Sequence, residues 1–112
     1  PTAKISSPVV LGRGVTIGPN SVLTGPVVMG PGCRVGRNTV IEDAVIWSDT
    51  RIGDSITMKQ CVVGAGSVIE DQCWITNGAI IGDRCRIGAG NKLEHAIRVW
   101  PSKSIDANTI TF

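Results

Sequence analysis

Large apolar residues recur about every six positions between Ile5 and Ile105, and this period predicts an all-β fold, a parallel β-helix. Many of these residues are followed by glycine, as in the segments LGRGVT, IGPNSV and VGAGSV. A fixed short period is typical of a solenoid, in which each turn buries its apolar side chains against the next turn. The repeats run from about residue 5 to residue 110, so we expect residues 1–112 to form one hexapeptide-repeat domain.

Three six-residue units, and so three faces, make one coil of about 18 residues, which divides the chain into about six triangular coils. The first units begin at Ile5, Leu23, Ile41, Met58, Ile75 and Leu93. The second begin at Leu11, Met29, Trp47, Val63, Ile81 and Val99, and the third at Ile17, Val35, Ile52, Ile69, Ile87 and Ile105. This register requires two units of only five residues, Trp47 to Arg51 and Met58 to Val62.

The other positions of the units are consistent with this layout. The fifth positions of the first units form one column of aliphatic side chains: Val9, Val27, Val45, Val62, Ala79 and Ile97. Glycine is frequent at the second position, where it either adopts a positive φ or allows a neighbouring coil to approach closely. Strands stacked at about 4.8 Å per coil predict a rod of roughly 30 Å.

Composition and charge exclude several classes of partner. The 42% hydrophobic content is ordinary for a water-soluble protein, and no apolar run approaches the roughly 18 residues of a membrane span. The net charge of +2 and the scattered Lys and Arg residues indicate no nucleic-acid partner. No secretory signal opens the chain, so we expect a cytoplasmic location and no membrane partner.

Four cysteines could form disulfides, hold a metal or lie in the core. Cys33 and Cys85 occupy equivalent positions three coils apart, roughly 14 Å by strand spacing, which is too far for a disulfide. Cys73 lies on another face, Cys61 falls at a corner, and the sequence contains no CxxC pair. We therefore expect buried, reduced cysteines, with no metal site and no cofactor.

Three segments carry a resemblance to a known family: AVIWSDTRIGDS, ITMKQCVVGAG and IRVWPSKSIDANTI. They resemble the left-handed β-helix domain at the C-terminus of nucleotide-sugar pyrophosphorylases, in particular mannose-1-phosphate guanylyltransferase-like enzymes. The resemblance implies a single-stranded left-handed parallel β-helix. In that family a separate domain, with a Gly-rich, Arg-containing loop and metal-binding Asp residues, joins a nucleoside triphosphate to a sugar 1-phosphate. The resemblance therefore implies a non-catalytic oligomerisation or regulatory domain of a nucleotidyltransferase that acts in nucleotide-sugar synthesis.

His95 is the one histidine of the chain, and it separates the enzymatic alternatives. Hexapeptide repeats also occur in γ-class carbonic anhydrases, which need three histidines to hold zinc and are therefore excluded. Hexapeptide acyltransferases use a single histidine as general base between subunits. This leaves the alternative of a stand-alone acyltransferase-like protein with His95 as the candidate catalytic residue, although His95 also suits an exposed polar position.

Apolar residues at outward-facing sixth positions are the candidate interaction surface. On the first face these positions hold Val10, Val28, Ile46, Ile80 and Arg98, and on the third face they hold Val22, Val40, Thr57, Trp74, Lys92 and Ile110. Contiguous exposed apolar surface generally marks an interface, although β-branched residues also favour strands for intrinsic reasons. We expect an interface of Val10, Val28, Ile46, Trp74 and Ile80. It would join copies of the chain in a dimer or trimer, or pack against a nucleotidyltransferase domain.

Overall fold

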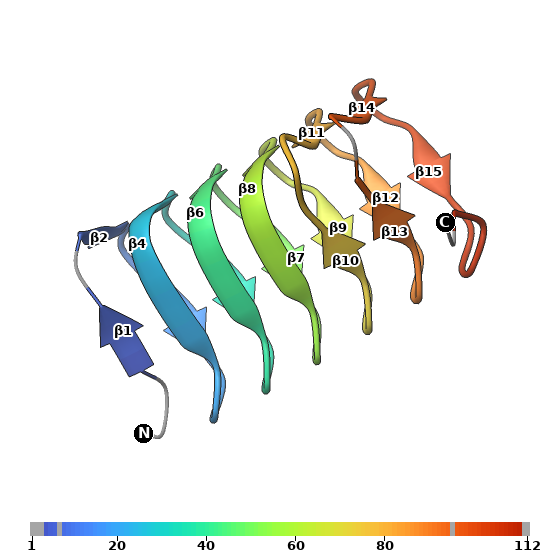
Figure 1. Ribbon diagram of the computed structural model, residues 1–112. Helices are drawn as coiled ribbons and strands as arrows, with labels where there is room; N and C mark the ends of the chain where they lie inside the picture. The colour runs from blue at the N-terminus through green and yellow to red at the C-terminus, as the bar shows by residue number, and fades with distance from the viewer. Residues whose placement is uncertain (1–3, 7, 95, 111–112) are drawn as a thin grey trace.

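The computed structural model describes residues 4–6, 8–94 and 96–110 as a rod of stacked coils. Short parallel strands follow one another along a single axis, and the two ends of the chain lie at opposite ends of the rod (Figure 1). The molecule measures 33 × 21 × 19 Å along its principal axes, close to the predicted length. The prediction of a left-handed parallel β-helix of about six coils is confirmed.

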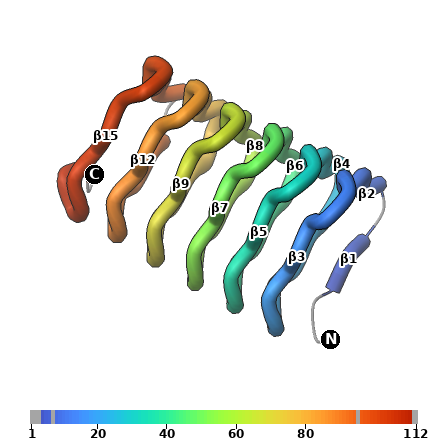
Figure 2. Tube along the Cα trace, turned by 180° about the vertical axis from the view of Figure 1, so that it is seen from behind, coloured from blue at the N-terminus to red at the C-terminus, as the bar shows by residue number. Residues whose placement is uncertain are grey.

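All strand pairing is parallel and joins each coil to the next. The larger sheet contains nine strands: β1 (Lys4–Ser6), β2 (Val9–Leu11), β4 (Val22–Met29), β6 (Val40–Ile46), β8 (Thr57–Val63), β10 (Trp74–Ile75), β11 (Ile80–Ile81), β13 (Lys92–Leu93) and β14 (Arg98–Val99). The smaller sheet contains six strands: β3 (Thr16–Ile17), β5 (Arg34–Val35), β7 (Arg51–Ile52), β9 (Val68–Ile69), β12 (Arg86–Ile87) and β15 (Ser104–Ile105). The smaller sheet forms one face of the triangle and lies toward the viewer in Figure 2, which shows the molecule from behind.

The larger sheet covers the other two faces because its central strands bend around a corner. β1 pairs with the first part of β4, and β2 pairs with the last part of the same strand. Figure 1 shows the long curved strands β4, β6 and β8 side by side. In later coils the same path is divided into β10 with β11, and β13 with β14.

Inward-facing aliphatic side chains form three continuous columns that fill the rod. The columns include Leu23, Ile41, Met58, Ile75 and Leu93 from the first face, Met29, Ile46, Val63 and Ile81 from the second, and Val35, Ile52, Ile69 and Ile87 from the third. Burying one such side chain is worth about 1.5–3 kcal/mol, so these columns supply most of the stabilising burial.

One of the two predicted five-residue units is in a different place. Ile46, and not Trp47, pairs with Met29 on one side and Val63 on the other. Ile46 is 1% exposed, whereas Trp47 is 56% exposed. The first short unit therefore spans Ile41 to Val45 instead of Trp47 to Arg51, and the second, Met58 to Val62, is confirmed.

This correction changes which residues face inward around the first corner. The ladder shifts between Thr24 and Val27, and Ala44 is the residue that pairs with Val27. The buried column is therefore Val9, Val27, Ala44, Cys61, Ala79 and Ile97, and the predicted members Val45 and Val62 instead lie beside Val28 and Ile80. A close-packed interior accepts an aliphatic side chain at position 46 and leaves the larger indole of Trp47 outside.

Close approach of the coils, and not positive φ, explains the second-position glycines. A Cβ atom added to Gly12 would lie 2.5 Å from the backbone nitrogen of Pro31 in the next coil. A Cβ atom on Gly30 would lie 2.7 Å from the backbone nitrogen of Ser48. Neither glycine has a positive φ.

The corrected register predicts opposite outcomes for two adjacent substitutions. Ile46→Ala should lower the free energy of unfolding by about 2–5 kcal/mol because it leaves a cavity in a buried column. Trp47→Ala, the matched control, should cost far less because the indole is exposed. Urea denaturation followed by circular dichroism measures both, and a larger loss for Trp47→Ala would contradict the register.

Candidate functional site

Five aliphatic residues form a continuous stripe on the outside of the larger sheet. Strand pairing places them directly next to one another in successive coils: Val10, Val28, Val45, Val62 and Ile80, here called the apolar stripe. Val10, Val28 and Ile80 are exposed, and Val45 and Val62 are half-buried. Arg98 pairs with Ile80 and continues the column in the last coil.

The apolar stripe differs from the sequence-based expectation at two positions. Ile46, predicted as an outward residue, is buried, and its place is taken by Val45. Val62 belongs to the stripe although the sequence interpretation placed it inward. The sequence contains a signal that would have given the correct register. If the first five-residue unit begins at Ile41, the outward positions form an uninterrupted stripe of five aliphatic residues.

Tryptophan side chains extend the exposed apolar surface. Trp74 lies in β10 between Thr57 and Lys92, on the face of the larger sheet that lies across the first corner from the stripe. Trp47 and Trp100 occupy second positions, where other coils have glycine, and Trp100 is 74% exposed. All three tryptophans of the chain are therefore exposed, and Trp47 follows the stripe residue Val45 by two positions.

Three cysteines take the structural role that serine and threonine have in neighbouring coils. The thiols of Cys33, Cys73 and Cys85 each donate a hydrogen bond to a carbonyl oxygen of the next coil. These bonds are Cys33 Sγ to Trp47 O at 2.9 Å, Cys73 Sγ to Gly88 O at 3.2 Å, and Cys85 Sγ to Trp100 O at 3.0 Å. The hydroxyls of Ser21, Thr39 and Ser67 make the equivalent bonds to Gly36, Gly53 and Gly82.

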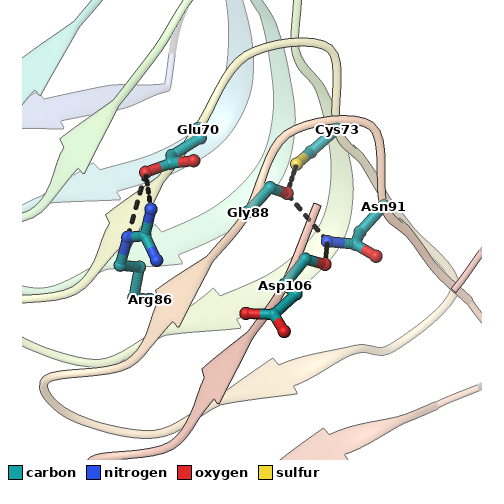
Figure 3. A network of polar contacts seen from close by, with 6 residues as sticks. All are labelled: Glu70, Cys73, Arg86, Gly88, Asn91 and Asp106. Atoms are coloured by element: carbon teal, nitrogen blue, oxygen red, sulfur yellow. Dashed lines mark hydrogen bonds and ion pairs between the residues drawn. The ribbon is translucent and has the colours of Figure 1, made fainter. Parts of the chain in front are cut away.

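The last coils continue this ladder with an amide (Figure 3). Asn91 is fully buried, and its Nδ2 atom donates to the carbonyl oxygen of Gly88 at 2.8 Å and to that of Asp106 at 2.9 Å. Its Oδ1 atom accepts from the backbone nitrogens of Thr109 and Ile110. The small polar side chains at these corners therefore connect one coil to the next.

The prediction that the cysteines are buried and free is confirmed for all four. Burial raises the pKa of the Cys33 and Cys73 thiols. Burial, together with the nearby carboxylate of Asp43, raises the pKa of Cys61 to about 12. These thiols are protonated at neutral pH, whereas nucleophilic attack and metal binding require the thiolate.

His95 lies outside the described residues, so its proposed catalytic role remains a prediction. Within residues 4–6, 8–94 and 96–110, no group of three or more His, Cys, Asp and Glu side chains is placed to hold a metal ion. The same residues include no helix long and apolar enough to cross a membrane.

The raised pKa of Cys61 predicts a loss of stability in alkaline solution. The folded state holds this proton up to about pH 12, whereas the unfolded thiol releases it near its ordinary pKa of 9.0. The stabilising contribution is therefore complete below pH 9 and is lost as the pH rises from 9 toward 12. The melting temperature should fall across this range, and it should fall less in Cys61→Ala, which continues the column of Ala44 and Ala79. Equal decreases in melting temperature in the two proteins would contradict the assignment of this pH dependence to Cys61.

Two acyltransferases are among the solved structures to which this chain is similar. None of the curated protein sequences matches the chain. Among solved structures, UDP-N-acetylglucosamine O-acyltransferase from Moraxella catarrhalis is 15% identical with a TM-score of 0.48, over 99% of this chain and 65% of that one. The Arabidopsis UDP-N-acetylglucosamine acyltransferase is 13% identical with a TM-score of 0.43, over 96% of this chain and 57% of that one. The chain thus spans less than two thirds of either acyltransferase, and likenesses at this level carry no argument about function.

A family comparison gives a more specific result. The model of the EIF2B subunit epsilon LbH domain matches residues 1–109, nearly the whole chain. The segments around Trp47, Cys61 and Trp100 resemble β-helix domains of nucleotidyltransferase-like proteins, and this match agrees with that resemblance. The chain therefore belongs to the EIF2B subunit epsilon LbH domain family.

Proposed function

We propose that the chain is a non-catalytic oligomerisation and regulatory domain of a sugar-phosphate nucleotidyltransferase-like protein that acts in nucleotide-sugar synthesis. Its partner is a second copy of the chain, in a dimer or trimer, or a nucleotidyltransferase domain. Membership of the EIF2B subunit epsilon LbH domain family supports the nucleotidyltransferase-like context. The observation that carries the proposal is the exposed apolar stripe.

Several properties of the apolar stripe support an interface. Its five residues occupy consecutive coils at a spacing of about 4.8 Å, so they present one unbroken apolar ridge along the rod. Val10, in the first coil, is 62% exposed although valine is usually buried. The exposed Trp47 and Trp100 each follow an outward residue of this column, Val45 and Arg98, by two positions, and tryptophan is enriched in the energetically dominant parts of interfaces.

The buried thiols support a structural rather than a catalytic domain. Cys33, Cys73 and Cys85 act as hydrogen-bond donors between coils, and Cys61 fills a column of small side chains. Their chemistry is thus used to hold the coils together. Four free cysteines also support a reducing compartment, and we propose the cytoplasm.

The proposal predicts that charge placed on the apolar stripe disrupts assembly. The double variant Val28→Glu, Ile80→Glu places two carboxylates on the ridge three coils apart, roughly 14 Å by strand spacing, where a partner would bury them. Sedimentation velocity should show the unmodified chain as an oligomer and the double variant as a monomer. Binding to an added nucleotidyltransferase domain should weaken in parallel if that domain is the partner.

A matched control lies on the smaller sheet. Val68 is half-buried on β9, away from the stripe, so Val68→Glu should leave the assembly unchanged. An unmodified chain that sediments as a monomer and binds no nucleotidyltransferase domain would contradict the proposal. Equal losses in the control and in the double variant would contradict the assignment to this surface.

A further inference from the structure

The smaller sheet, which faces the viewer in Figure 2, carries three arginines among its six outward positions and is a different sheet from the one that carries the apolar stripe. Its outward positions, from β3 to β15, are Thr16, Arg34, Arg51, Val68, Arg86 and Ser104. Arg34 and Arg51 pair directly in the β5–β7 register, which places two like charges in adjacent strands. Like charges opposite one another destabilise a sheet unless something neutralises them.

Arg86 is neutralised within the sheet, whereas the other two arginines are not. Glu70 accepts from Arg86 Nη2 at 2.8 Å and from Arg86 Nε at 3.0 Å (Figure 3). Among the described residues, no carboxylate lies within ion-pair distance of Arg34 or Arg51. Two guanidinium groups one coil apart are therefore left without a counter-charge.

Asp54 and Asp71 follow strands β7 and β9 of the smaller sheet, and both accept hydrogen bonds from the backbone. Asp49, two residues before Arg51, folds over Gly32. Asp54 Oδ1 accepts from the backbone nitrogen of Arg37, and Asp71 Oδ1 accepts from the backbone nitrogen of Asp54, both at 2.9 Å. The two carboxylates fold over Gly36 and Gly53, where any side chain on the glycine would collide with them. Their role at the corner is structural.

A groove runs beside the two arginines. It has a volume of about 540 Å³, and its lining includes Arg34, Arg51, Gly36 and Gly53. Two carboxylates also line it: Glu70, which is paired with Arg86, and Asp71, which accepts from the backbone nitrogen of Asp54. The two glycines contribute only backbone to its surface. A ligand can therefore lie against the sheet with both guanidinium groups at its edge.

We propose that Arg34 and Arg51 form a binding site for a phosphoryl group. Guanidinium groups are planar donors that match the oxygens of a phosphate, and a coil spacing of about 4.8 Å allows two of them to contact one tetrahedral anion. The site goes beyond the proposed assembly function and lies on a different sheet. Its ligand is inorganic phosphate or a small phosphorylated molecule that also occupies the groove.

Titration of the whole chain tests the site. Inorganic phosphate and a sugar 1-phosphate are added separately at constant ionic strength, and backbone amide shifts are followed by nuclear magnetic resonance. Saturable shifts should be confined to β5, β7 and the groove. Equal affinities identify the phosphoryl group alone as the ligand, whereas tighter binding of the sugar 1-phosphate indicates that the groove holds the remainder of the molecule.

Some substitutions should weaken phosphate binding and another should strengthen it, which makes the test specific. Arg34→Gln and Arg51→Gln should each weaken binding about tenfold or more because a charge-assisted contact is lost. Glu70→Gln should strengthen binding because it removes one of the two groove carboxylates and frees Arg86. Arg98→Gln, which makes the same change of charge on the larger sheet, is the control and should leave affinity unchanged.

Several results would overturn the proposal. These are the absence of saturable binding of either phosphate probe, equal weakening by Arg34→Gln and Arg98→Gln, and binding of a polyglutamate peptide but not of phosphate. The last result would assign the face to an acidic protein segment. Loss of assembly in the stripe variants would not alter any of these readouts, so the two proposals fail independently.

Discussion

Axial stacking of the coils in register is the constraint on which the rest of the structure depends. Backbone groups of each coil bond to the next, as in Val22 N to Thr39 O at 2.9 Å and Gly36 N to Ile52 O at 2.8 Å. Because pairing is parallel and the coils are nearly equal in length, residues at equivalent positions form columns. Several columns are apolar and buried, others carry small hydrogen-bonding side chains, and others face solvent. The column of a residue therefore sets whether its side chain faces the core or the solvent.

The columns explain why one short unit affects both the core and the surface. Starting the unit at Ile41 turns Ile46 inward and Val45 outward, and it makes the stripe continuous from Val10 to Ile80. Equivalence of positions within a column also explains the cysteines. A thiol at a serine or threonine position keeps the bond to the next coil, and an amide does so at Asn91. The two surfaces that we propose as functional then lie on different sheets, the apolar stripe for assembly and the arginine pair for an anion.

Most of what could be predicted from the sequence came from the six-residue period. Counting residues along the chain is enough to assign each one to a column, and the column indicates whether its side chain points inward or outward. Most inward residues that begin a unit, the outward Val10, Val28 and Ile80, and the buried cysteines were predictable in this way. Val62, predicted inward in the fourth coil, lies outward. The third coil was not predictable, because Ile46 and Trp47 are both large and apolar, and only packing distinguishes them. Hydrogen bonds from the thiols, and the pairing of Glu70 with Arg86, depend on contacts between coils that no spacing specifies.

Amide hydrogen exchange measures the stacking of the coils most directly. In a solenoid each coil is stabilised only by its neighbours, so the central coils should open least often. In the first coil the inward residues Ile5 and Leu11 are exposed, whereas their partners Leu23 and Met29 are buried. The account predicts that protection is highest in β6 and β8 and decreases toward β1, β2 and β15. Uniform protection along the rod, or faster exchange in β6 and β8 than in the terminal strands, would contradict it.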